Sequence, residues 1–167
     1  MENNADEISE IIDNLRRSMK AINEYSRNAE KETGLTGPQL WAIKLVAGSA
    51  PIKVSDLARR MYLHPATVVG ILDRLESKGL VQRTRSTEDR RVVEIDLTAQ
   101  GRVVVRQAPE VAQGMLVKGL ESLSREKLSH VSESMKEIVR ILGAEDFPPQ
   151  LLFSQEVNLP EEPTTKP

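Results

Sequence analysis

Apolar side chains recur every three or four residues along the N-terminal segment, from Ala5 to about Lys31. This spacing is that of one face of an α-helix. The stripe consists of Ile8, Ile11, Ile12, Leu15, Met19, Ile22, Tyr25 and Ala29. A helix of ~27 residues is ~40 Å long, which is more than one small domain covers. We therefore expect part of this stripe to pack on another chain.

Three more helices are predicted before residue 80. The first begins at Thr36-Gly37-Pro38 and ends at Gly48, the second covers about Val54–Met61, and the third runs from Pro65 to about Lys78. Threonine is a suitable N-cap, proline fits a first helical turn, and Gly79 provides a C-terminal stop. The helical wheel of the third helix has two sides. The side expected in the core carries Val68, Ile71, Leu72 and Leu75, and the other carries Ala66, Val69, Gly70, Asp73 and Ser77.

A two-residue alternation replaces the helical period after Gly79. Residues 81–85 and 92–97 alternate as the strands of a hairpin do, around an Arg-rich tip. Thr98 is expected to cap a fifth helix that runs through about Gly119 and is kinked at Pro109. Ser124 is expected to open a sixth helix that ends at Gly143. Its apolar stripe is Leu128, Val131, Met135, Ile138, Val139 and Leu142.

These elements predict a mostly α protein with a small β-hairpin wing. We expect a winged helix-turn-helix domain flanked by a helical dimerisation region. Residues 1–35 would be an N-terminal dimerisation helix, 36–100 the DNA-binding domain, 101–143 the C-terminal dimerisation helices, and 144–167 an acidic, Pro-rich tail. The tail's composition alone indicates disorder. Its Leu151-Leu152-Phe153 cluster favours docking instead, on a groove of its own chain or of the partner chain. The docking place would lie near either the dimerisation helices or the winged domain.

Charge is distributed unevenly along the 167 residues. The net charge is -2, yet residues 53–102 carry ten Lys and Arg against seven Asp and Glu. Attraction to phosphate depends on such local charge, because screening limits its range to ~8 Å at physiological salt. The chain has no Cys and two His, so thiol chemistry is excluded and a His-rich metal site is not expected. No apolar run is long enough to span a membrane, and the first residues are acidic, so we expect a cytoplasmic protein. We expect no cofactor.

The hairpin tip, Asp89-Arg90-Arg91 ahead of Val92-Val93-Glu94-Ile95-Asp96-Leu97-Thr98, resembles the wing motif of the MarR family of bacterial transcription regulators. The order of elements resembles that family over roughly residues 5–143. The resemblance implies that Arg91 enters a minor groove, that Asp89 holds its guanidinium, and that Arg90 contacts phosphate. An arginine in a narrow minor groove reads groove width. The alternative interpretation of the motif is a turn of solvated charges.

The predicted recognition helix departs from the family pattern. His64-Pro65-Ala66-Thr67-Val68-Val69 stands where the family usually has Ser-Pro-Ser-Thr-Val-Thr, so three hydroxyl groups are missing. Thr67 can still donate to a phosphate or a base, and Ala66 and Val69 can touch thymine methyl groups. His64 is either a phosphate donor or a modest surface cap, and Gly70 either permits close approach to DNA or is a neutral small residue. Further candidate DNA contacts are Lys53, Ser55, Arg83 and Arg85. Arg59 and Arg60 either lie near the DNA backbone or form a solvated face of their helix. Arg74 is expected in salt links to the wing.

The resemblance also implies a homodimer on a dyad-symmetric DNA site, often released by a small aromatic or lipophilic ligand. Candidate ligand residues are Arg16, Tyr25 and Trp41, although Tyr25 and Trp41 also suit the core and Arg16 the surface. No phosphate loop, paired carboxylates, metal-ligand spacing or nucleophile–base pair indicates an enzyme. We expect a DNA-binding transcription regulator that acts as a repressor, in the family's usual mode, with a winged protein-interaction module as the alternative.

Overall fold

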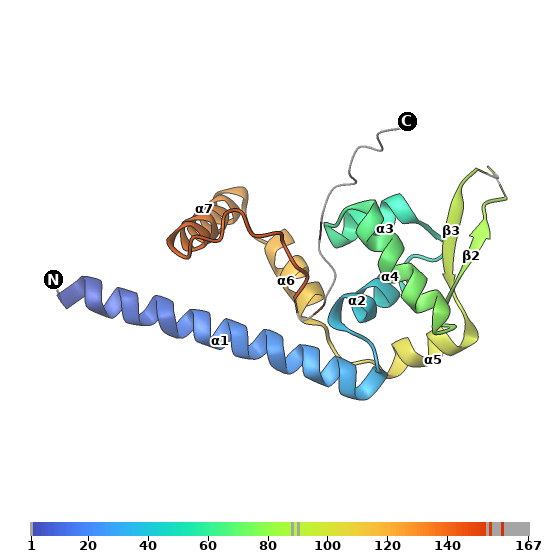
Figure 1. The fold of residues 1–167 in the computed structure, drawn as a ribbon, viewed down its shortest axis with the longest axis horizontal. Coiled ribbons are helices and arrows are strands. Elements are labelled where there is room, and N and C mark those ends of the chain that lie inside the picture. The colour runs from blue at the N-terminus through green and yellow to red at the C-terminus, as the bar shows by residue number, and fades with distance from the viewer. Residues whose placement is uncertain (1, 88, 90, 153, 155–157, 159–167) are drawn as a thin grey trace.

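The computed structural model describes residues 2–87, 89, 91–152, 154 and 158. Helices occupy most of this chain, and a small antiparallel sheet has the strand order β1-β3-β2. The elements are α1 Glu2–Thr33, α2 Gly37–Ala47, β1 Ile52–Lys53, α3 Val54–Met61, α4 Pro65–Ser77, β2 Val81–Arg85, β3 Val93–Leu97, α5 Ala99–Gln107, α6 Ala112–Glu121 and α7 Arg125–Ile141. Figure 1 shows the sheet and helices α2–α5 at one end, with α1 and α7 extending away from them. This is the predicted fold class, a winged helix-turn-helix with additional helices.

The core lies within the winged end of the molecule. Val68, Ile71, Leu72 and Leu75 of α4 are all fully buried, so the predicted inner face of that helix is confirmed. They belong to one apolar cluster with α2, α3 and the sheet. Burial of aliphatic side chains of this size contributes about 1.5–3 kcal/mol each, which makes this cluster the main source of stability.

The strand β1 was not predicted from the sequence. It has two residues, and Ile52 pairs with Ile95 of β3 in antiparallel register. The hairpin itself is as expected, with Val81 opposite Leu97 and Arg85 opposite Val93. Two residues are too few for a detectable alternation, so a strand of this length leaves no pattern.

The prediction of a single kinked helix from Thr98 to Gly119 is wrong, because the chain forms two helices there. α5 ends at Gln107, and Ala108 is extended with φ -74° and ψ 137°. A residue that precedes proline is pushed out of the helical region by the proline ring, so the helix ends before Pro109 instead of bending. Lys44 of α2 donates to the Pro109 carbonyl at 2.5 Å. The break frees α6 to pack against α1 and α2.

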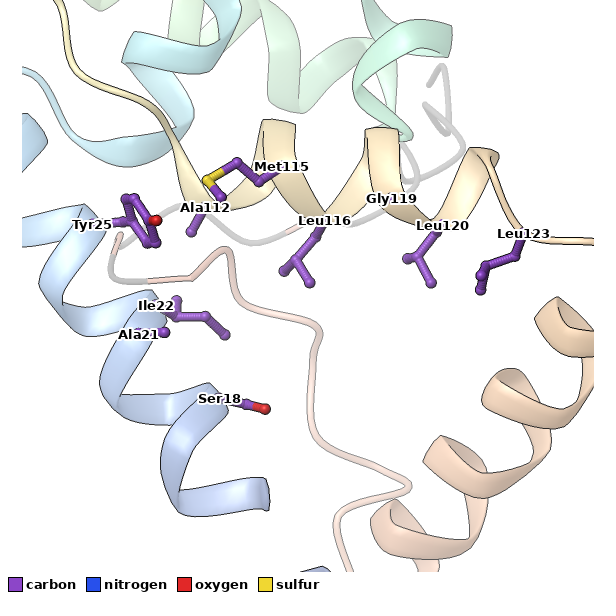
Figure 2. A pocket seen from close by; sticks show the side chains of 10 residues that line it. All are labelled: Ser18, Ala21, Ile22, Tyr25, Ala112, Met115, Leu116, Gly119, Leu120 and Leu123. Atoms are coloured by element: carbon purple, nitrogen blue, oxygen red, sulfur yellow. The ribbon is translucent and has the colours of Figure 1, made fainter. Parts of the chain in front are cut away.

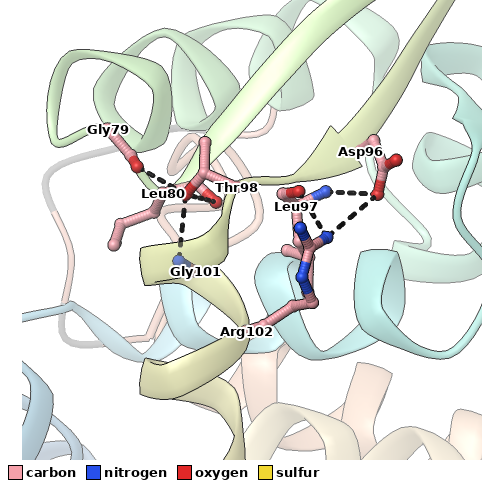
Figure 3. A network of polar contacts seen from close by, with 7 residues as sticks. All are labelled: Gly79, Leu80, Asp96, Leu97, Thr98, Gly101 and Arg102. Carbon is pink, nitrogen blue, oxygen red and sulfur yellow. Dashed lines mark hydrogen bonds and ion pairs between the residues drawn. The ribbon is translucent and has the colours of Figure 1, made fainter.

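Thr98 joins the wing to α5, as its predicted capping role requires. Its Oγ1 accepts from the Gly101 amide at 3.0 Å and donates to the Gly79 carbonyl at 2.7 Å (Figure 3). Gly101 is buried against the backbone of Leu80. Arg102 adds a bond from its guanidinium to the Leu97 carbonyl at 2.7 Å. The end of α4, the end of β3 and the start of α5 therefore meet in one hydrogen-bonded junction.

The described part of the tail is irregular and docks on the protein. Leu151 is half-buried and packs against the core cluster, as the docking interpretation predicted. Leu152 is more exposed, and Phe153 lies outside the described residues. The Leu151 side chain of the tail therefore anchors it to the core.

Candidate nucleic-acid interface

Helix α4 presents a mixed surface opposite its buried face. Ala66, Val69 and Asp73 are exposed, whereas Thr67 and Gly70 are half-buried. Pro65 occupies the first turn, and the N-cap residue His64 makes no side-chain capping bond. A Cβ at Gly70 would meet nothing within 4 Å, so the fold itself does not require glycine there. The outer side of α4 is therefore small, weakly polar and open to a partner.

The wing tip, residues 86–92, is shaped by Asp89. Its carboxylate accepts from the backbone N–H of Arg91 at 2.9 Å, and its carbonyl accepts from the Val92 amide at 2.9 Å. The family-implied pair between this carboxylate and the Arg91 guanidinium is not among the contacts of the described residues. Arg85 and Arg91 are both exposed, and Arg90 lies outside the described residues. Asp89 thus fixes the turn that carries Arg91.

Arg83 connects the wing to the recognition helix. Its two terminal nitrogens contact Asp73 Oδ1 and Glu76 Oε2, each at 2.6 Å, and both acceptors lie on α4. The planar guanidinium fork suits two such charge-assisted bonds and constrains orientation as well as distance. Asp73 and Glu76 therefore make salt links to the wing, a role that the sequence had suggested for Arg74. The phosphate contact predicted for Arg83 stays a prediction. It would use a guanidinium that already bonds two carboxylates.

The remaining candidate cations surround α3 and α4. Lys53 and Ser55 are exposed at the start of α3. Arg59 pairs with Asp56 at 2.8 Å, and Arg60 donates to Ser49 Oγ at 2.5 Å. Arg74 is exposed near the end of α4. Across residues 53–102, which include α3, α4 and the hairpin strands, ten Lys and Arg stand against seven Asp and Glu.

The turn between α3 and α4 contains a contact that no sequence pattern indicated. Tyr62 adopts a left-handed conformation with φ 54°, and its hydroxyl donates to Glu121 Oε1 of α6 at 2.8 Å. This hydrogen bond, together with the negative charge of Glu121, raises the pKa of Tyr62 above its ordinary value. The two residues are 59 positions apart, so no local period could pair them. The contact links the start of the recognition helix to α6.

An apolar groove lies between α1 and α6 (Figure 2). It has a volume of about 510 Å³, and Tyr25 is among its lining residues. Its other walls are Ser18, Ala21, Ile22, Ala112, Met115, Leu116, Gly119, Leu120 and Leu123. Trp41 instead lines a second cavity of about 250 Å³ beside the tail, and Arg16 pairs with Asp13 at 2.9 Å outside both. The three predicted ligand residues are therefore not brought together.

Neither a membrane span nor a metal cluster is present in the described ranges. None of their helices is both long and apolar enough to cross a bilayer. No three His, Asp or Glu residues of these ranges are grouped to hold a metal ion.

Comparisons with known proteins identify the family of the segment that contains α4. The model of the MarR family matches residues 35–93. Over 108 residues the chain is 31% identical to the organic hydroperoxide resistance transcriptional regulator of Bacillus subtilis, covering 65% of this chain and 72% of that relative. Over 121 residues it is 29% identical to the transcriptional repressor MdtR of the same organism, covering 72% and 78%.

Solved structures agree with these sequence relatives. A MepR-like protein crystallised with pseudoligands superposes with a TM-score of 0.52 at 26% identity, over 82% of this chain and 94% of that one. The match includes helices on both sides of the winged domain, since it covers most of the chain. On these grounds the chain belongs to the MarR family of winged helix-turn-helix regulators, and it is a DNA-binding transcriptional regulator rather than an enzyme.

Proposed function

We propose that this protein represses transcription as a homodimer on a pseudo-palindromic operator in the cytoplasm. The observation that carries the DNA-binding geometry is the double contact of Arg83 with Asp73 and Glu76. It holds the wing and α4 in one orientation, which lets α4 occupy a major groove while Arg91 reaches the neighbouring minor groove. The relative MdtR is named a repressor, and a regulator seated on its operator blocks access to that DNA.

The proposed contacts divide into two kinds. Base and groove contacts are assigned to Arg91 and to the outer side of α4. Positioning contacts with phosphate are assigned to the exposed cations and polar groups around them. In full, the proposed DNA-binding residues are Ser55, His64, Ala66, Thr67, Val69, Gly70, Arg74, Arg83, Arg85, Asp89, Arg90 and Arg91. Among them Asp89 acts through the turn that carries Arg91, and Arg83 acts through its ion pairs with α4.

Arg91→Ala should weaken operator binding by about 1–3 kcal/mol while leaving random DNA nearly unaffected, because a groove contact discriminates among sequences. The matched variant Arg85→Ala removes an exposed wing cation that we assign to phosphate. It should weaken both duplexes alike and reduce the salt dependence of binding. Binding titrations at several salt concentrations, on an operator obtained by selection and on a random duplex, measure both effects.

Equal operator affinity of wild type and Arg91→Ala would contradict the groove assignment. A wild-type protein without salt-dependent DNA affinity would favour the winged protein-interaction module instead.

The homodimer is supported by apolar side chains that the single chain leaves exposed. The stripe on α1 includes Ile8, Leu15 and Met19, and that on α7 includes Val131 and Met135. No residue of α7 is buried within the chain. Continuous apolar surface of this kind marks an interaction site, and two-fold pairing of identical stripes covers it in both copies.

Release by a small apolar ligand is supported by the groove between α1 and α6. It joins the long helix of the proposed interface to α6, which also contacts the turn before α4 through Glu121. A volume of about 510 Å³ suits a small organic molecule. The MepR-like relative was solved with pseudoligands. A ligand that spreads α1 from α6 would therefore change the position of α4.

Gly119→Phe should abolish binding of the apolar dye 1-anilinonaphthalene-8-sulfonate in this groove. Gly119 lines the groove, and a Cβ there would meet nothing within 4 Å, so the added ring can fill the space without distorting the backbone. Lys118→Phe, which adds the same ring on another side of α6, should leave dye binding unchanged. Fluorescence titration distinguishes them, and equal dye affinity in both variants would reject the groove as the site.

A further inference from the structure

The tail forms one wall of the cavity beside Trp41. This cavity of about 250 Å³ lies between α2, the α3–α4 turn and α6, where Trp41, Leu63 and Val117 face Leu151. Two hydrogen bonds fix the tail around this anchor. Gln113 Nε2 of α6 donates to the Leu152 carbonyl at 3.4 Å. The backbone N–H of Asn158 donates to the Pro149 carbonyl at 3.0 Å, which closes the tail into a loop.

Asn158 brings this loop to the recognition helix. Its side-chain Oδ1 accepts from the backbone N–H of His64 at 2.8 Å. His64 is the N-cap of α4, which has no side-chain capping bond and no acidic residue in its first turn. In a capping box, this N–H is satisfied by a Glu or Gln side chain three residues further along the same helix. Asn158 supplies the equivalent acceptor from a position 94 residues away.

We propose that this contact is autoinhibitory: Asn158 occupies the amino end of α4 and competes with DNA phosphate for it. The proposal rests on the DNA binding proposed above. The first residues of a recognition helix meet the DNA, and backbone N–H groups at helix starts donate to phosphate oxygens. The backbone N–H of His64 cannot donate a full hydrogen bond to Asn158 and to a phosphate at the same time.

The charge of the tail adds to this competition. Residues 144–167 contain five acidic side chains and one lysine. An acidic segment tethered to the protein repels the phosphate backbone within the screening distance of ~8 Å, so its effect on DNA binding is largest at low salt. Because Leu151 anchors the loop nearby, Asn158 returns as an intramolecular ligand at a high effective concentration. Operator binding must therefore displace Asn158 from His64 each time.

The test uses three variants of the full chain. Asn158→Ala removes the acceptor, Leu151→Ser weakens the anchor, and Phe147→Ser is the control, because Phe147 is a tail residue that is 71% exposed and outside the cavity. We expect Asn158→Ala to tighten binding to operator and to random duplex by about two- to tenfold, the equivalent of one net hydrogen bond. Leu151→Ser should tighten binding at least as much, most strongly at low salt, and Phe147→Ser should match wild type.

Amide hydrogen exchange at His64, measured without DNA, gives a second readout. Exchange should be faster in Asn158→Ala than in wild type and Phe147→Ser. Weaker DNA binding in the two tail variants would overturn the proposal, since the tail would then position α4 for DNA rather than compete with it. Unchanged affinity with faster exchange would also overturn it. If wild type bound no DNA, the proposed function would fail, while His64 exchange would still report the tail contact.

Discussion

Met135→Lys should convert the protein from a dimer to a monomer at micromolar concentration. Met135 is 51% exposed in the single chain and lies within the apolar stripe of α7. A two-fold interface contains each substituted position twice, so the variant would bring two unpaired charges into one apolar contact. Burial of an unpaired charge is strongly unfavourable, and we expect a loss of at least about 3 kcal/mol in dimerisation free energy. Light scattering coupled to size-exclusion chromatography measures the change.

Glu133→Lys is the matched control for this experiment. It introduces the same lysine on the opposite side of α7, where Glu133 is exposed, and it should remain dimeric. Leu15→Lys should reproduce the monomer from the α1 stripe if both helices form one interface. A monomeric wild type would contradict the proposed assembly directly.

Gly101→Ala should destabilise the winged domain by about 3 kcal/mol, the upper end of the usual cost of overpacking. An added Cβ would lie 2.0 Å from the Leu80 carbonyl oxygen. This oxygen belongs to the backbone between α4 and β2 and cannot rotate away as a side chain could. The clash is therefore relieved only if α5 moves away from the wing. That movement also strains the bond from the Gly101 amide to Thr98 Oγ1. Chemical denaturation at a fixed protein concentration measures the difference in free energy of unfolding.

Gly119→Ala provides a control of opposite sign. Gly119 also lies within a helix, but a Cβ there would meet nothing within 4 Å. Replacement of glycine by alanine in an open helical position increases stability by about 1 kcal/mol. A Gly101→Ala variant as stable as Gly119→Ala would show that α5 does not approach Leu80 as closely as described.

Local signals predicted the elements that depend on local chemistry. The burial of Val68 and Ile71 followed from helical periodicity, and the cap at Thr98 followed from its position before a helix. Pro109 was recognised as a disruption, but its effect was underestimated. Its ring excludes Ala108 from the helical region, so α5 ends there instead of bending.

Contacts between distant segments were outside the reach of these signals. Tyr62 and Glu121 show no shared period, and neither do His64 and Asn158. The family motif associated Asp89 with the Arg91 guanidinium, but the contact made is with the backbone N–H of Arg91. A motif identifies which residues cooperate, whereas the hydrogen-bond geometry of a turn decides which atoms meet.

The attachment of Arg83 to α4 has a consequence for the DNA sequences that this protein can recognise. If the wing and α4 move as one rigid body, the number of base pairs between their two contacts within a half-site is fixed. Insertion of one base pair between these two contacts should then move either α4 or Arg91 out of its groove, because the protein cannot change their separation.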